Sequence, residues 1–145
     1  MALVVGTIGL AACSSSSSSS STTTTPRSFE ISTSSGQVSV SLDGKLPPGW
    51  PADTPVPKGA TPAGSGSLVG QSKGVMVGVY RTNESPESVY GFYTSDPSIT
   101  VSTKASAGSG SSYVGHVKMT APVSADVTIV PYQNETLIVV VITQP

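Results

Sequence analysis

The sequence has few of the side chains from which active sites are usually built. Only 10% of its 145 residues are charged, against about a quarter in an average globular protein. It also contains one cysteine and one histidine. One cysteine excludes an internal disulfide and a multi-cysteine metal site, and one histidine excludes ligand sets that need two. We therefore predict no metal, no cofactor and no catalytic residue.

The chain also lacks an excess of one charge. Seven Lys and Arg residues against eight Asp and Glu residues give a formal net charge of -1. Because a phosphate backbone is attracted by a basic surface, nucleic acid is not an expected partner. A single domain fits a chain of this length.

The apolar run at the N-terminus is too short to cross a membrane. Ala2 to Leu10 would span roughly 15 Å as a helix, about half of a hydrocarbon core of ~30 Å. A run of this length is typical of the hydrophobic part of a signal peptide. Small residues follow it directly, and then the only cysteine, in the order Leu10-Ala11-Ala12-Cys13.

This tetrapeptide resembles the lipobox of bacterial lipoproteins. The resemblance implies that residues 1–12 are a signal peptide, that a peptidase cuts before Cys13, and that the Cys13 thiol carries a diacylglyceryl group. It implies a lipid-anchored protein on the extracytoplasmic face of the cell membrane. Signal peptides normally begin with positive charge, whereas no Lys or Arg precedes Cys13. The alternative is a buried N-terminal strand with an unmodified Cys13, which Gly6 and Gly9 disfavour.

Residues 13–27 read as a linker between the anchor and a folded domain. Ser14 to Ser21 and Thr22 to Thr25 have no apolar side chains to bury, so they cannot offset the entropy of ordering. We predict a disordered tether of roughly 20 Å r.m.s. length. It is similar to the glycosylated stalks of actinobacterial cell-wall lipoproteins, although a plain spacer is the interpretation we favour.

Residues 28–145 read as a single α+β domain. Alternating apolar and polar residues in Phe29–Thr33 and Gln37–Leu42, with a turn at Ser34-Ser35-Gly36, predict a hairpin. The prolines of residues 46–62 predict an extended surface stretch, because proline removes backbone donors. Gly64-Ser65-Gly66 reads as a loop.

The second half of the domain reads as a strand, a helix and four more strands. The strand lies in residues 68–82, most clearly from Gly74, with Val75, Val77 and Val79 on one face and Met76 and Tyr80 on the other. Ser85, Pro86 and Glu87 are typical of a helix start, and Val89, Phe92 and Tyr93 form one apolar stripe. The later strands are expected at residues 99–104, 111–120, 125–130 and 136–143.

Glycine-rich and polar turns between the later strands favour an antiparallel β-sheet meander with the one short helix packed on it. Leu137 to Ile142 is apolar without alternation, which predicts a central strand with both faces covered. The helix is expected on one face. The proline-rich stretch or the first hairpin is expected on the other.

The segment Trp50 to Pro57, the valine-rich strand and the helix that opens Ser85-Pro86-Glu87 also resemble a recurrent domain of actinobacterial lipoproteins. The resemblance extends over most of residues 49–143. It implies a cell-envelope protein but no particular reaction.

Two residues stand out as candidates for a site. His116 shares a strand face with Lys118 and Thr120, and we expect an exposed surface histidine there. Trp50 stands between prolines in a stretch expected at the surface, so it is a weak candidate for ligand binding. The alternative for Trp50 is a lid over the sheet.

We expect a non-catalytic binding or scaffolding domain held at the membrane by its diacylglyceryl anchor, with an envelope polymer, a lipid or a protein as its partner. The first alternative is an envelope-polymer hydrolase with a pair of carboxylates. The second is a passive surface component. The acidic residues outside the linker that such a pair could use include Asp43, Asp53, Glu84, Glu87, Asp96 and Asp126.

Overall fold

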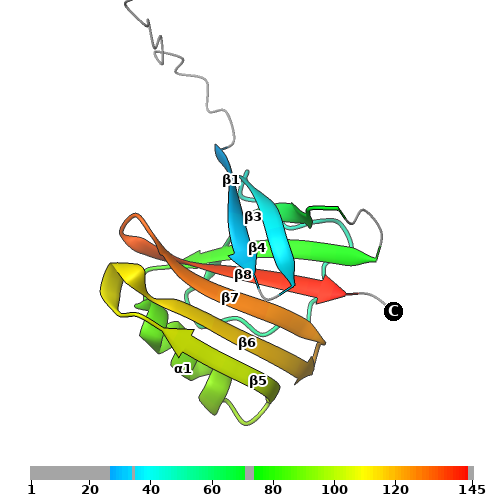
Figure 1. Cartoon of the computed structure of the whole chain (residues 1–145). Helices are drawn as coiled ribbons and strands as arrows, with labels where there is room; N and C mark the ends of the chain where they lie inside the picture. The colour runs from blue at the N-terminus through cyan, green and yellow to red at the C-terminus, as the bar shows by residue number, and fades with distance from the viewer. Residues whose placement is uncertain (1–26, 34, 71–73, 144–145) are drawn as a thin grey trace, which may run out of the picture.

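The computed structural model describes residues 27–33, 35–70 and 74–143. They form one antiparallel sheet of eight strands with one α-helix packed on it (Figure 1), which confirms the predicted α+β class. The strands are β1 (Arg27–Thr33), β2 (Gly36–Leu42), β3 (Thr61–Leu68), β4 (Val75–Thr82), β5 (Thr100–Ala107), β6 (Val114–Ala121), β7 (Ala125–Tyr132) and β8 (Glu135–Thr143). The helix α1 (Pro86–Ser95) connects β4 to β5, and a single 3₁₀ turn, η1 (Gly110–Ser112), precedes β6.

The strand order β1-β2-β3-β4-β8-β7-β6-β5 joins two antiparallel units. The predicted meander of the later strands is confirmed, because β5, β6, β7 and β8 pair in sequence. The two units meet where β4 pairs with β8, from Val75 opposite Thr143 to Thr82 opposite Thr136. Strands β1 and β5 therefore form the two edges of the sheet.

The central strand β8 is covered on both faces, as its continuous apolar sequence predicts. Ile138, Val140 and Ile142 belong to one buried cluster, and Leu137, Val139 and Val141 belong to the other. We call these two sides of the sheet the helix face and the hairpin face. The alternation in β4 is also as predicted, because Val77 and Val79 lie on the hairpin face and Tyr80 on the helix face.

The first hairpin, and not the proline-rich stretch, covers the second face of β8. Val38 and Val40 of β2 are buried in the cluster on the hairpin face. The proline-rich stretch instead packs beside α1 on the helix face, through Leu46, Trp50, Val56 and Ala60. The sheet thus folds over on itself, and Figure 1 shows the first hairpin, β1 and β2 in blue and cyan, at a steep angle to β7 and β8.

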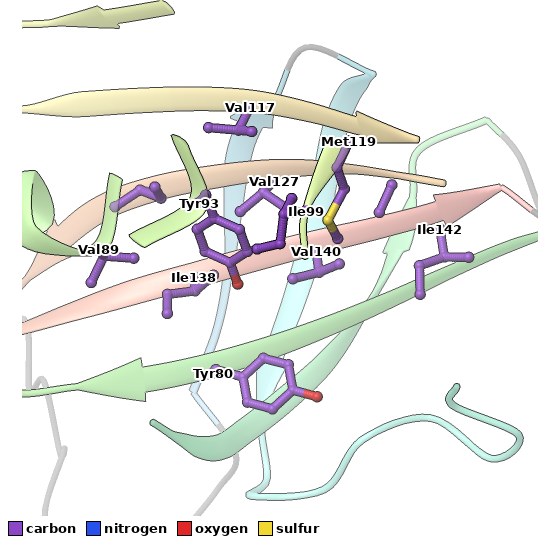
Figure 2. Close-up of a cluster of buried hydrophobic side chains, with 12 residues drawn as sticks. Tyr80, Val89, Tyr93, Ile99, Val117, Met119, Val127, Ile138, Val140 and Ile142 are labelled. Carbon is purple, nitrogen blue, oxygen red and sulfur yellow. The ribbon is translucent and has the colours of Figure 1, made fainter. Parts of the chain in front are cut away.

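The helix forms where its capping residues predict. The Ser85 side chain accepts a hydrogen bond from the Ser88 amide, and Pro86 occupies the first helical position. Val89 and Tyr93 are fully buried, and Figure 2 shows both pointing from the helix toward residues of the sheet. Within the described residues, no helix is long and apolar enough to span a bilayer.

The prediction of a loop at Gly64-Ser65-Gly66 is wrong, because these residues lie inside β3. A Cβ atom on Gly64 would lie 2.0 Å from the Ser41 carbonyl oxygen, and one on Gly66 would lie 2.5 Å from that of Ser39. Glycine is needed here because β2 and β3 approach closely where the sheet folds over. In the sequence alone, a Gly-Ser-Gly segment is typical of a loop.

The proline-rich stretch also differs from its prediction. It does not run fully extended: residues 43–60, which we call the strap, contain turns in which the amides of Trp50, Thr54 and Ala60 donate to the proline carbonyls three residues earlier. Its last predicted residues, Thr61 and Pro62, already belong to β3. Pro62 is tolerated because the register between β3 and β4 shifts beside it.

Two other strand boundaries differ from their predicted positions. Leu68 ends β3 and does not begin the next strand, which starts at Val75. The strand expected from Ser111 begins at Val114, because residues 110–112 form the 3₁₀ turn.

Candidate functional site

A groove lies between the end of β1 and the hairpin face of the sheet. Its volume is about 430 Å³, within the range of roughly 300–1,000 Å³ typical of small-molecule sites. We call it the hairpin groove. It is lined by Ser32, Thr33, Thr103, Ala105, His116, Lys118 and Asp126. Every lining residue except Ala105 has a hydroxyl, an imidazole or a charge.

The floor of the groove follows from the register of three strands. Lys118 of β6 lies opposite Thr103 of β5 on one side and opposite Asp126 of β7 on the other. His116 likewise lies between Ala105 and Thr128. Because side chains two residues apart share a face of a strand, these two rows present their side chains on the same side of the sheet.

Two contacts hold β1 over this floor. The Ser35 hydroxyl donates a hydrogen bond to Oδ2 of Asp126, and the ring of Phe29 stacks on Tyr132 with 5.2 Å between the ring centroids. The contacts lie near opposite ends of both β1 and β7. They align the edge strand along β7 and leave β5 and β6 uncovered beside it.

His116 is not the fully exposed histidine that the sequence predicts. Its side chain is half-buried, and Nδ1 lies 3.2 Å from the hydroxyl oxygen of Thr128. Thr128 is completely buried, so this contact provides the partner that a buried hydroxyl needs. The imidazole is therefore held in place by β7, and Nε2 makes no hydrogen bond with any described residue.

The groove contains one residue of each charge. Lys118 is exposed and Asp126 is half-buried. Among the described residues the Lys118 ammonium forms no ion pair, whereas the Asp126 carboxylate accepts from Ser35. The cation therefore remains available to a ligand, while the carboxylate is partly engaged.

Trp50 lies on the other side of the sheet. Its indole ring covers Gly78, where a Cβ atom would lie 2.6 Å from the ring, and its Nε1 donates to the Tyr80 hydroxyl over 2.8 Å. Burial raises the pKa of Tyr80, and the hydrogen bond from Trp50 lowers it by a smaller amount. This placement matches the lid alternative, and a ligand-binding role for Trp50 stays a prediction.

A second tyrosine attaches the strap to the helix. The Tyr93 hydroxyl donates to the Pro55 carbonyl over 2.9 Å. Burial is the main reason that the pKa of Tyr93 is raised far above its ordinary value, and the nearby Tyr80 raises it further. The strap therefore covers the helix face, where the hydrogen bonds of Trp50 with Tyr80 and of Tyr93 with Pro55 attach it.

Several of the acidic residues considered for a carboxylate pair have local structural partners. Asp43 accepts from the Lys45 amide, and Glu87 accepts from the Gly110 amide. Asp96 accepts from the Ser98 amide and hydroxyl, and the hydroxyl is the larger cause of the lowered pKa of Asp96. No group of three or more His, Cys, Asp and Glu residues that could hold a metal occurs in the described part of the chain.

Cys13, the predicted site of lipidation, lies outside the described residues, as do the signal peptide and nearly all of the linker.

Comparisons with family models, with curated proteins and with solved structures find no match to this chain. Of the residues that line the groove, the sequence indicated only His116 and, as one of several acidic residues for a carboxylate pair, Asp126. The polar face of β6, which carries His116 and Lys118, is the signal that could have indicated more of the groove.

Proposed function

We propose that the protein is a lipid-anchored protein of the bacterial cell envelope whose domain binds a ligand outside the membrane without catalysing a reaction. The hairpin groove carries this proposal. It is a concave site that brings a cation, a carboxylate, an imidazole and the hydroxyls of Ser32 and Thr103 together.

The position of the groove relative to the linker supports an envelope partner over a membrane lipid. The linker enters the domain at Arg27, the first residue of β1, whereas Ser32 and Thr33 at the end of β1 line the groove. At about 3.3 Å per residue, these points lie roughly 15–20 Å apart along the strand. A domain tethered at Arg27 can therefore present the groove away from its anchor, toward an envelope polymer or another protein.

The groove supports binding better than hydrolysis by a carboxylate pair. Such hydrolases use two carboxyl groups on either side of the bond that they cleave. Asp126 is the one carboxylate among the residues that line the groove, and it already accepts from Ser35. A binding role needs no second carboxylate.

The anchor is tested by labelling cells with a palmitate analogue. The chain with Cys13→Ala should lose the label and leave the membrane fraction, because two acyl chains provide the stable attachment. Ser14→Ala, one residue further on, is the matched control and should keep both. A Cys13→Ala protein that is still labelled would contradict the anchor.

The binding function is tested by sedimenting the full chain with isolated envelope material. Wild type should co-sediment, and Lys118→Gln should do so much less. Lys104→Gln is the matched control, because Lys104 pairs with Val117 and lies on the opposite face of β5 from the groove. Equal sedimentation of both variants and wild type would contradict a role for the groove.

A further inference from the structure

We infer that the hairpin groove binds a sugar acid, meaning a hydroxylated ring with one carboxylate. The inference rests on the proposed binding function and specifies its ligand. It follows from the charged residues in the groove, from the hydroxyls around them, and from the lack of aromatic side chains among the residues that line it.

Of the two charged residues in the groove, the cation is the less engaged. Lys118 is exposed and forms no ion pair among the described residues, so its ammonium can pair with an anion. A ligand ammonium would instead need Asp126, whose Oδ2 already accepts from the Ser35 hydroxyl. The groove therefore offers an anion a partner that is unpaired among the described residues, and offers a cation only a carboxylate that is partly engaged.

The rest of the lining suits ligand hydroxyls. Ser32 and Thr103 have hydroxyls that can both donate and accept, whereas the Thr33 hydroxyl already donates to the Gly36 carbonyl and accepts from the Ser35 amide. Asp126 uses one oxygen for Ser35, and a carboxylate keeps further lone pairs that can accept from a hydroxyl. His116 adds Nε2, since its Nδ1 is engaged by Thr128. A simple inorganic anion would leave most of these groups unused.

The lining also argues against a neutral sugar as the main ligand. Binding of neutral sugars commonly relies on an aromatic ring that packs against the apolar face of the sugar. The residues that line the groove include no aromatic side chain. Without a ring for the sugar to stack on, the groove can select its ligand through hydrogen bonds and charge, and charge-assisted hydrogen bonds are about twice as strong as neutral ones. A volume of about 430 Å³ fits a ligand of monosaccharide size better than a large cofactor.

The chain itself supplies a reporter for this site, because His116 is its only histidine. We would titrate the full chain with Cys13→Ala, which removes the lipid, and follow the single imidazole in ¹H–¹³C NMR spectra. The probes are glucuronate, glucose, inorganic phosphate and glycine. Glucuronate should shift the imidazole signals along a saturable curve and bind more tightly than the other three.

Variants then assign the contacts. Lys118→Gln should weaken glucuronate binding about tenfold or more, as expected when a charge-assisted contact is lost. Asp126→Asn should weaken it less, with folding checked by the dispersion of the spectrum. Lys104→Gln should leave the affinity for glucuronate unchanged.

Each other outcome overturns a stated part. If glucose binds as tightly as glucuronate, the ligand's negative charge is not needed. If phosphate binds as tightly, the sugar ring is not needed. If glycine binds more tightly, the ligand class is an amino acid and not a sugar acid. If no probe shifts the imidazole while the wild-type chain still sediments with envelope material, the sugar-acid inference fails and the proposed function stands. If glucuronate binds but the chain does not sediment, the ligand class stands and the envelope material as the partner of the proposed function fails.

Discussion

The two faces of the sheet are built from the same strands but are used differently. On the helix face the apolar surface is continuous from β4 to β6, and residues such as Tyr80, Ile138 and Val117 are buried under α1 and the strap. On the hairpin face the buried apolar cluster lies over β4 and β8, where β2 covers it, and extends to Val130 and Tyr132 at one end of β7. Toward β5, β6 and the other end of β7, that face carries the residues that line the groove.

The difference is clearest within β7, where neighbouring residues serve opposite purposes. Val127 and Ile129 are fully buried on the helix face. Asp126 and Thr128, on the other side of the same strand, contact Ser35 and His116. A sheet of this kind can be stabilised mainly by apolar packing on one face, so that part of the other face can carry polar groups. Three predictions follow the comparison from the largest expected effect to the smallest.

Removing Tyr93 should damage the helix face most. Tyr93→Ala deletes a fully buried ring and should lower the free energy of unfolding by about 3–5 kcal/mol, as for other large aromatic deletions in cores. Chemical denaturation measures the change. Tyr93→Phe is the control, because it removes only the hydrogen bond to Pro55 and should cost about 1 kcal/mol. Equal effects of the two substitutions would show that the ring does not anchor this face.

Adding a methyl group at Gly64 should disturb the fold of the sheet that creates the hairpin face. The new Cβ would lie 2.0 Å from a backbone oxygen of β2, which a side-chain rotation cannot relieve, so Gly64→Ala should cost about 3 kcal/mol. Gly91→Ala is the control, because a Cβ there meets nothing within 4 Å and should stabilise the helix by about 0.5–1 kcal/mol. Thermal unfolding of both variants measures these changes in stability. A Gly64→Ala protein as stable as wild type would contradict the close approach of β2 and β3 at Gly64.

Removing the Ser35 hydroxyl should have the smallest and most local effect. Ser35→Ala deletes the hydrogen bond to Asp126 and should cost about 1 kcal/mol. Amide hydrogen exchange should become faster in β1 and remain unchanged in β6 and α1. The exposed Ser67 provides the control, since Ser67→Ala removes a hydroxyl from β3, which pairs with neither β1 nor β7. Faster exchange throughout the sheet would mean that the contact supports the whole fold.

Much of the fold could be predicted because its signals are local. The helix start depends on Ser85 and Pro86, whose effects extend over one turn of chain. The meander of β5 to β8 follows from strands separated by short turns. The pairing of β4 with β8 joins residues more than fifty positions apart, and no local pattern specifies it. The loop predicted at Gly64 is wrong for the same reason. The backbone that leaves no room for a side chain at Gly64 belongs to β2, which is distant in the sequence.

By itself, the sequence determined which side chains share a face of each strand, because that alternation is a property of the extended backbone. It placed Lys118 beside His116, and it separated Val77 from Tyr80. Only the tertiary structure decided which faces meet. Ser35 and Asp126 lie 91 residues apart in the chain and yet form a hydrogen bond, because the sheet folds over at Gly64 and brings the first hairpin onto β7. The groove exists only as a result of that fold.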